Sequence, residues 1–395
     1  MNPKTVVLLI SDLEFGGAQR QVVELANHLD PERFTAYVCT LADYTPLAPS
    51  LVDHQKRLVV IRRHFKWDLS VVLRLAAFLR RKRAAVVHSF LFDADIAARI
   101  AGRLAGRTAV IGSERNTDYE PRTRHKIAYA LTRFGLDLMV ANSNAGARFN
   151  SRVFHNPPSI YRVVHNGVDA DRFAPQDGAL ARRELGLRPG DPVVGMFASF
   201  KPQKNHSLLL RAAVRVLRAV PEATFLFVGD ELYKGMSDSV AFKKAVSALV
   251  DQLGIRDRCV FAGNRADVER IYCACDCTVL PSLFEGTPNV VLESMSCGVP
   301  VVATDVSDNS YIVREGETGF IVPVDDETLM AERIVSLLQD PGIRRQMGTR
   351  AREWVLGEFS SEALAAKTAR VYDEAVALKY GRFAPSGGAN TDRME

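Results

Sequence analysis

Residues Phe284–Pro300, FEGTPNVVLESMSCGVP, decide the fold. Thr287 is a good N-cap residue, and Pro288 suits the first position of a helix. Gly298, followed by proline two residues later, is typical of a helix end. The stretch therefore predicts a short capped helix that lies between two strands of a parallel α/β sheet.

Short apolar strands alternate with segments of helical period on both sides of this helix. The second half predicts strands at Val193–Ala198, Ala223–Val228, Cys259–Ala262, Thr278–Leu280 and Pro300–Thr304. The first half predicts strands at Thr5–Ile10, Thr35–Leu41, Leu58–Ile61, Ala85–Phe90, Ala109–Gly112, Leu138–Asn142 and Tyr161–His165. The alternation predicts two Rossmann-like domains with separate cores and a ligand cleft at the carboxyl ends of their strands.

The predicted domains are residues 1–172 and 192–358, joined by a linker rich in Pro and Gly at 173–191. A helical period resumes near the end of the chain and predicts a C-terminal helix within 359–380. Residues 381–395 have no apolar pattern, and we expect this tail to be disordered.

Charge divides unevenly along the 395 residues. Residues 1–170 carry 24 Lys and Arg against 15 Asp and Glu, a balance of +9, whereas the remainder has a balance of −4. A basic first half favours an anionic partner, such as a membrane surface or an anionic lipid carrier. No zinc finger, RNP strand or aromatic interleaving supports nucleic acid. The apolar runs are far shorter than a membrane span, and we expect a cytoplasmic protein.

Two patterns resemble metal sites but have a simpler explanation. Cys273, Cys275 and Cys277 lie where a helix passes into a strand, which suits small buried residues, and no further ligand follows at zinc-type spacing. The sequences Asp93-Ala-Asp95 and Asp169-Ala-Asp171 are interpreted as capping residues. We therefore expect no bound metal.

Three elements carry the candidate chemistry. Free amides at the start of the predicted helix, at Asn289 and Val290, form an anion site suited to phosphate. Glu285 and Glu293 flank this start, and a carboxylate accepts two hydrogen bonds from a vicinal diol such as that of a ribose or hexose.

The other two elements follow the first strand of each half. Gly16-Gly17 lets the backbone approach a ligand closely, but the full GxGxxG pattern is absent, which disfavours a hydride-transfer enzyme. In Ala198–His206, ASFKPQKNH, a lysine can neutralise a departing diphosphate.

Together these elements resemble the family 4 glycosyltransferases, retaining GT-B enzymes that use nucleotide sugars. The matching features are Gly16-Gly17, His88, Ala141-Asn142-Ser143, His165-Asn166-Gly167-Val168-Asp169, Lys204-Asn205 and the Glu-x7-Glu motif of Glu285 and Glu293. The resemblance implies two Rossmann-like domains that face a central cleft, with a C-terminal helix that crosses back onto the first domain.

The resemblance also implies roles for individual residues. Glu293 would bind the ribose, Glu285 the transferred sugar, and Lys204 the diphosphate. Ser199 replaces an arginine usual in the family, and Lys201 is expected to supply the missing cation; Arg115 takes the place of a sugar-contacting histidine. The expected catalytic residues are Lys204, Glu285, His88 and Arg115. The expected donor-binding residues are Gly16, Gly17, Ser199, Lys201, Lys204, Asn264, Arg265, Glu285, Gly286, Thr287, Asn289, Val290 and Glu293.

No cofactor is expected beyond the co-substrate, a UDP-sugar by preference or a GDP-sugar. The basic first half would meet the acceptor, a lipid-linked or growing cell-envelope glycan on the inner membrane face. Three alternatives stay open: a transferase acting on a small soluble acceptor, a nucleotide-sugar epimerase, and an inactive nucleotide-sugar-binding scaffold. Departures at Ser199 and Arg115 favour the last of these.

Overall fold

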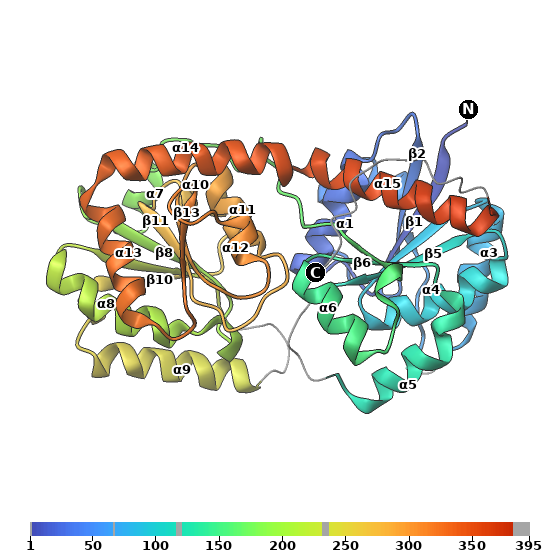
Figure 1. The fold of residues 1–395 in the computed structure, drawn as a ribbon, viewed down its shortest axis with the longest axis horizontal. Helices are drawn as coiled ribbons and strands as arrows, with labels where there is room; N and C mark the ends of the chain where they lie inside the picture. The colour runs from blue at the N-terminus through green and yellow to red at the C-terminus, as the bar shows by residue number, and fades with distance from the viewer. Residues whose placement is uncertain (1, 66–67, 116–120, 231–236, 382–395) are drawn as a thin grey trace.

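The computed structural model describes residues 2–65, 68–115, 121–230 and 237–381, which form two domains built on parallel sheets. Figure 1 shows the domains side by side, with two long helices running along one edge from the second domain to the first. The predicted fold class is confirmed. The expected disordered tail lies, from residue 382 onward, outside the described residues.

The first domain contains a seven-stranded sheet in the order β3-β2-β1-β4-β5-β6-β7. Its strands are β1 (Lys4–Ile10), β2 (Phe34–Thr40), β3 (Leu58–Val60), β4 (Val86–Phe90), β5 (Ala109–Glu114), β6 (Leu138–Ala141) and β7 (Tyr161–Val163). Its helices are α1 (Gly17–His28), α2 (His54–Arg57), α3 (Ser70–Arg81), α4 (Phe92–Ala105), α5 (Thr123–Thr132) and α6 (Asn144–Val153). Cores lie on both faces of the sheet, which explains the unbroken apolar run in β1.

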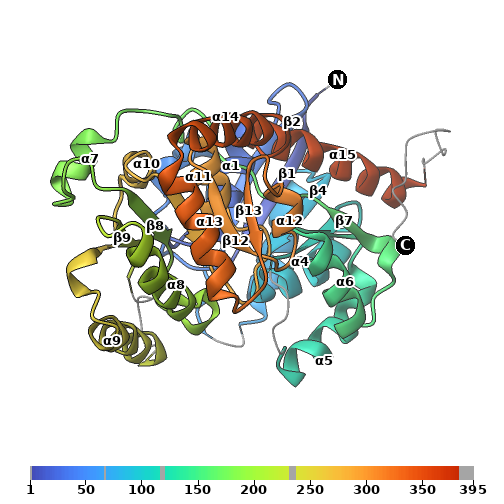
Figure 2. The ribbon, with the colours of Figure 1, turned by 60° about the vertical axis from the view of Figure 1, so that its left-hand side comes forward.

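The second domain contains a six-stranded sheet in the order β10-β9-β8-β11-β12-β13. Its strands are β8 (Val193–Phe197), β9 (Thr224–Val228), β10 (Cys259–Gly263), β11 (Cys277–Leu280), β12 (Val301–Thr304) and β13 (Gly319–Val322). Its helices are α7 (Ala179–Glu184), α8 (His206–Ala219), α9 (Ser237–Gln252), α10 (Val268–Tyr272), α11 (Asn289–Ser296), α12 (Asn309–Ile312), α13 (Glu327–Gln339) and α14 (Pro341–Glu358). Figure 2 shows α8 and α13 together over one face of this sheet.

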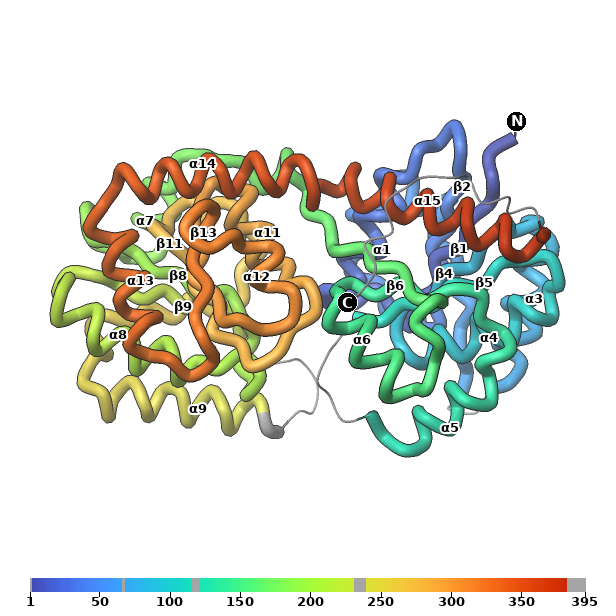
Figure 3. The backbone as a smooth tube through the Cα atoms, in the orientation of Figure 1, coloured from blue at the N-terminus to red at the C-terminus, as the bar shows by residue number. Residues whose placement is uncertain are grey.

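The last helix, α15 (Ser361–Tyr380), returns to the first domain, as predicted. Figure 3 shows the chain passing directly from α14 into α15 across the gap between the domains. Leu364, Ala369 and Tyr372 are buried in the core of the first domain. The chain passes from the first domain to the second near Val168, and this earlier crossing lies beside the later one. Val168 donates its amide proton to Phe359 O (2.8 Å) and accepts from Ser361 N (3.0 Å). Both connections between the domains therefore run side by side.

The stretch predicted as a linker, 173–191, packs largely on the second domain. Phe173 and Leu187 are buried in a core cluster of that domain. A Cβ added at Gly178 would lie 2.3 Å from the carbonyl oxygen of Cys273, so the backbones approach closely there. The short helix α7 lies within this stretch.

The sequence analysis missed β13. This strand has four residues, lies at the edge of the sheet beside β12, and follows the four-residue helix α12 rather than a crossover helix of usual length. The alternation on which the prediction depended is therefore broken at this point. Among the described residues, no helix combines the length and apolar composition needed to cross a bilayer.

Candidate active site

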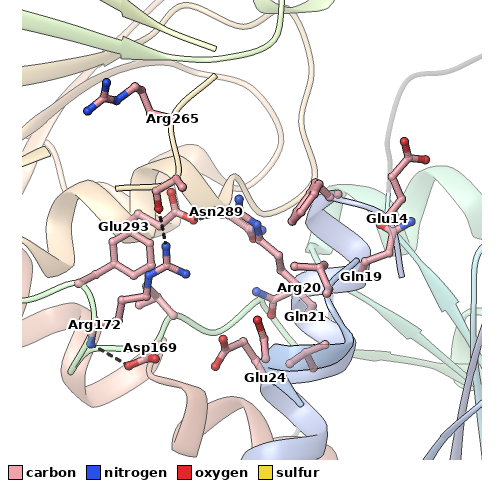
Figure 4. A pocket seen from close by; sticks show the side chains of 18 of the residues that line it. Glu14, Gln19, Arg20, Gln21, Glu24, Asp169, Arg172, Arg265, Asn289 and Glu293 are labelled. Carbon is pink, nitrogen blue, oxygen red and sulfur yellow. Dashed lines mark hydrogen bonds and ion pairs between the residues drawn. The ribbon is translucent and has the colours of Figure 1, made fainter. Parts of the chain in front are cut away.

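A cavity of about 1000 Å³ lies between the domains, at the carboxyl ends of the second sheet. Three of its lining residues follow neighbouring strands: Ser199 after β8, Asp230 after β9 and Asn264 after β10. The opposite wall is formed by the first turns of α1. Figure 4 shows Arg20 projecting from α1 on one side, with Glu293 of α11 on the other.

Glu293 is held within this cavity by partners from both domains. The Tyr272 hydroxyl donates a hydrogen bond of 2.8 Å to its Oε2, and the Arg20 guanidinium of α1 lies 3.7 Å from its Oε1. Burial raises the pKa of Glu293, while Arg20 and the Tyr272 hydrogen bond act in the opposite direction. The result is a carboxyl group of fixed orientation at a wall of the cavity.

A second charged group precedes α11. Lys204 forms an ion pair with Glu285, and the Ser282 hydroxyl donates to the same carboxylate oxygen at 2.6 Å. Burial, followed by the charge of Lys204, lowers the pKa of Lys201. The structure therefore brings together Lys201, Lys204 and Glu285, three residues that the sequence analysis assigned to the sugar and diphosphate.

Helix α11 starts one residue later than expected. Pro288 is the N-cap residue and Asn289 the first helical residue, so the prediction of Thr287 as the N-cap is wrong. The Thr287 hydroxyl instead donates to the backbone carbonyl of Asn142 in the first domain. The Thr287 hydroxyl, which would otherwise cap α11, therefore forms a contact between the domains instead.

The segment before α11 is a point at which the two domains meet. Asn166 donates hydrogen bonds to Thr287 O (3.0 Å) and to Asn289 Oδ1 (2.7 Å). Its own Oδ1 accepts a hydrogen bond of 2.7 Å from Arg115. A Cβ added at Gly286 would lie 2.6 Å from the side-chain amide of Asn142, so only glycine permits this close approach.

Arg115 belongs to this interface rather than to the cavity wall. Its guanidinium lies over the ring of Phe90, 4.9 Å from the centroid, in addition to its bond with Asn166. Burial lowers the pKa of Arg115 to about 10. Its expected contact with substrate stays a prediction.

His88 lies in the core of the first domain, on β4. Its Nδ1 contacts the Tyr372 hydroxyl of α15 at 2.8 Å, and its Nε2 contacts the Ser113 hydroxyl at 2.7 Å. Only 1% of the residue is exposed, and burial lowers its pKa well below the usual value. His88 is not among the residues that line the cavity between the domains, so its expected catalytic role stays a prediction.

Besides Lys201, Lys204, Glu285, Gly286 and Thr287, the expected donor-binding residues separate into three groups. Those that line the cavity are Gly16, Ser199, Asn264, Arg265, Asn289 and Glu293. Gly17 lies beside the cavity, because its Cβ position is 3.5 Å from Asn289 Nδ2. Val290 packs against a core cluster of the second domain.

Sequence analysis missed two arginines of the cavity wall, Arg20 and Arg172. Arg20 follows Gly16 by four residues, about one helical turn, so a site at the glycines could have predicted it on the same face. Arg172 donates to Glu269 at 3.0 Å and to Ala266 O at 3.3 Å, contacts about a hundred residues away that no local pattern indicates.

Within the ranges that the structure describes, no group of three or more His, Cys, Asp or Glu side chains is arranged to hold a metal ion. Cys275 and Cys277 are buried and Cys273 is partly buried, in agreement with their interpretation as small core residues. Asp169 accepts hydrogen bonds from the amides of Asp171 and Arg172, as expected of a capping residue. The same prediction is wrong for Asp93 and Asp95, because Leu91 is the N-cap residue of α4 and the two carboxylates pair with Arg63 and Arg99.

Two family models together match most of the chain. The model described as Glycosyltransferase Family 4 matches residues 15–172, and the one described as Glycosyl transferases group 1 matches residues 179–354. The chain belongs to the group 1, family 4 glycosyltransferases. The two matches meet in the stretch that connects the first sheet to the second, so each covers one domain.

Named relatives differ in the acceptor that they use. A D-inositol 3-phosphate glycosyltransferase from Segniliparus rotundus is 34% identical over 251 residues, 63% of this chain but only 54% of that protein, so the match spans about half the relative's length. A UDP-Gal:alpha-D-GlcNAc-diphosphoundecaprenol alpha-1,3-galactosyltransferase from Escherichia coli is 27% identical over 69% of this chain and 71% of its own. The crystal structure of Anabaena HepE in complex with UDP has the same fold, with a TM-score of 0.81, 21% identity and coverage of 94% and 100%.

Proposed function

We propose that this protein is a retaining glycosyltransferase that moves a hexose-type sugar from a nucleoside diphosphate sugar to a hydroxyl of a lipid-linked, cell-envelope glycan. One observation carries the proposal: the start of α11 lies between the Lys204–Glu285 pair and Glu293, which faces the cavity at the carboxyl ends of the strands. A phosphate-binding helix start flanked by two carboxylates suits a ligand that combines a diphosphate with two sugars.

The donor is proposed to lie along α11. Glu293 would accept hydrogen bonds from the ribose diol, the amide of Asn289 and the lysines would hold the diphosphate, and Glu285 would orient the transferred sugar. Asn264 and Arg265, at the end of β10, would contact the base. UDP is the proposed nucleotide, and GDP is the alternative. The choice of UDP is supported by Anabaena HepE, a protein of the same fold whose crystal structure holds UDP.

The proposed reaction is a substitution on one face of the sugar. The bond between the anomeric carbon and the diphosphate oxygen breaks as the acceptor hydroxyl oxygen forms a bond to the same carbon. The departing phosphate takes the hydroxyl proton. Lys204 stabilises the negative charge that grows on this phosphate, and such stabilisation lowers the barrier because it is strongest in the transition state.

The lipid-linked acceptor is proposed on the charge of the first domain. Residues 1–170 carry a balance of +9, which favours an anionic acceptor such as a glycan on a lipid diphosphate. The Escherichia coli relative, named for an acceptor on diphosphoundecaprenol, supports the same class. A small phosphorylated acceptor is the second candidate, because the Segniliparus relative is named for inositol 3-phosphate.

The proposal is tested by thermal shift with UDP, GDP, ADP, TDP and their common sugar conjugates. Ligand at about 100 times its Kd stabilises the folded state by about 2.7 kcal/mol, so one nucleotide should raise the Tm clearly. Glu293→Ala should abolish most of that shift, because the ribose loses its acceptor. Glu317→Ala, at an exposed position of the same domain, is the matched control.

Two outcomes would count against the proposal. No shift with any nucleotide would favour an inactive scaffold over an enzyme. An equal shift in the wild type and in Glu293→Ala would remove Glu293 from the ribose site. Release of the nucleoside diphosphate that depends on added membrane extract would distinguish a transferase from an epimerase, which needs no acceptor.

A further inference from the structure

Helix α5 and the turn that follows it carry an exposed apolar stripe. Ile127, Leu131 and Phe134 are 55%, 70% and 67% exposed. Their spacing of four and three residues places them along one face of the helix. The opposite face is packed, since Tyr129 and Thr132 are buried there. Three neighbouring large apolar side chains in water are costly unless another surface covers them.

Basic side chains surround this stripe. Arg122, Arg124, Lys126 and Arg133 are all exposed. Residues 121–136 contain no Asp or Glu, so nothing within this stretch of sequence balances the four charges. An apolar stripe with a basic border is the composition of a helix that lies at the interface of an anionic membrane.

A second exposed apolar patch lies near the start of α4. Its apolar members are Phe65, Leu69 and Leu73, each more than 60% exposed. Two contacts connect the patches: Arg63 forms a 3.0 Å ion pair with Asp93 of α4, and the next residue back, Phe92, stacks on His125 of α5 with ring centroids 3.9 Å apart. The two patches therefore border one element at the carboxyl edge of the first sheet.

We propose that a docking face, defined as Ile127, Leu131 and Phe134 with Arg124, Lys126 and Arg133, binds the surface of an anionic lipid bilayer. The apolar side chains enter the boundary between headgroups and acyl chains, and the basic ones attract the headgroups. A second copy of this chain fits less well, because two such faces would bring like charges together.

The position of the docking face suits a lipid-linked acceptor, so this inference rests on the proposed function. In Figures 1 and 2, α5 lies at the lower edge of the first domain, away from α14 and α15. Helix α4, against which α5 packs, begins where β4 ends, at the edge of the sheet that faces the second domain. A bilayer at α5 would hold its lipid-linked glycans on the side of the first domain that faces the second domain.

The test is cosedimentation with vesicles of phosphatidylcholine, with and without phosphatidylglycerol. The wild type should bind the anionic vesicles, and added salt should weaken binding. Arg124→Glu with Lys126→Glu should weaken it by at least about 30-fold, since each basic residue near the surface contributes about five-fold. Leu131→Ser with Phe134→Ser should also release the protein. Ile343→Ser with Arg345→Glu, exposed positions on α14, is the matched control and should bind like the wild type.

Binding that is absent in the wild type, or equal in all variants, would overturn the proposal. Self-association of the wild type in sedimentation velocity, lost in Leu131→Ser with Phe134→Ser, would also overturn it, in favour of an interface between copies. Nucleotide thermal shifts measured on the same variants keep the two proposals separate. If variants of the docking face lose vesicle binding but bind nucleotide normally, their donor site is intact and the loss belongs to the docking face. If the wild type binds vesicles but no nucleotide, the proposed function is refuted and the membrane-docking proposal stands.

Discussion

The carboxyl ends of the two sheets hold similar residue types in opposite environments. In the second domain, the residues after β8, β9 and β10 line a cavity. In the first domain, polar residues at the ends of β4 and β5 are enclosed by α4 and α15. Ser89 donates to Asp95 at 2.8 Å, Asp95 pairs with Arg99 at 2.8 Å, and both members of that pair are 1% exposed.

In this comparison, the element packed against a polar side chain, more than the residue type, decides whether the side chain faces a cavity or is buried. His88 contacts Tyr372 because α15 covers that part of the first sheet. Glu293 faces a cavity because the wall across from it, on α1, is mostly polar and includes Gln19, Arg20 and Glu24. Three variants would break or sharpen this contrast.

Lys204→Ala should have the largest effect. Removal of one positive group from a departing phosphate costs about 10²–10³-fold in turnover, as for other groups that stabilise transition-state charge. Nucleotide affinity should change much less. Release of the nucleoside diphosphate with membrane extract as acceptor measures the first quantity and thermal shift the second. Lys244→Ala, exposed on α9, is the control; a Lys204→Ala protein that turns over like this control would refute the role of the lysine.

Glu114→Gln should change how stability depends on pH. Burial and the nearby Asp95 raise the pKa of Glu114 to about 8. Because the folded state holds this proton at pH values where the unfolded state has lost it, the free energy of unfolding falls as pH rises from about 5 to about 8. The fall is about 1.4 kcal/mol for each pH unit well below the pKa of about 8 and flattens as pH approaches it, which gives about 2 kcal/mol between about pH 6 and 8.

The glutamine variant should lack this part of the slope. Urea unfolding at several pH values measures it, with Glu317→Gln as the exposed control. An identical slope in the wild type and in Glu114→Gln would mean that the buried carboxyl titrates normally. The polar cluster of the first domain would then be more open to water than the contrast with the second domain requires.

Tyr372→Phe should have the smallest effect, a loss of about 1 kcal/mol in the free energy of unfolding. The variant removes one buried hydrogen bond from His88 and leaves its packing in place. Nucleotide binding and turnover should be unchanged if His88 only supports the fold. A fall in turnover with unchanged stability would instead favour the catalytic role that the resemblance implies for His88.

Much of the fold follows from local patterns. Strands and helices alternate with glycine and proline at their ends, and such signals need only a few neighbouring residues. The edge strand β13 escaped because the helix before it is too short to show a period. Within the candidate site, the segment from Glu285 to Glu293 could be predicted because its pattern spans only a few neighbouring residues. The Thr287 hydroxyl was misjudged because its partner, the Asn142 carbonyl, is 145 residues away.

The paired crossings at Val168 and Ser360 also constrain how the chain is made. The second domain is inserted between two parts of the first, whose core needs Leu364 and Tyr372 from α15. During synthesis the second domain can therefore complete its core while the first still lacks its last helix. We therefore expect the first domain to complete its core after the second. A chain cut short before Ser361 would leave the first domain with an open apolar face.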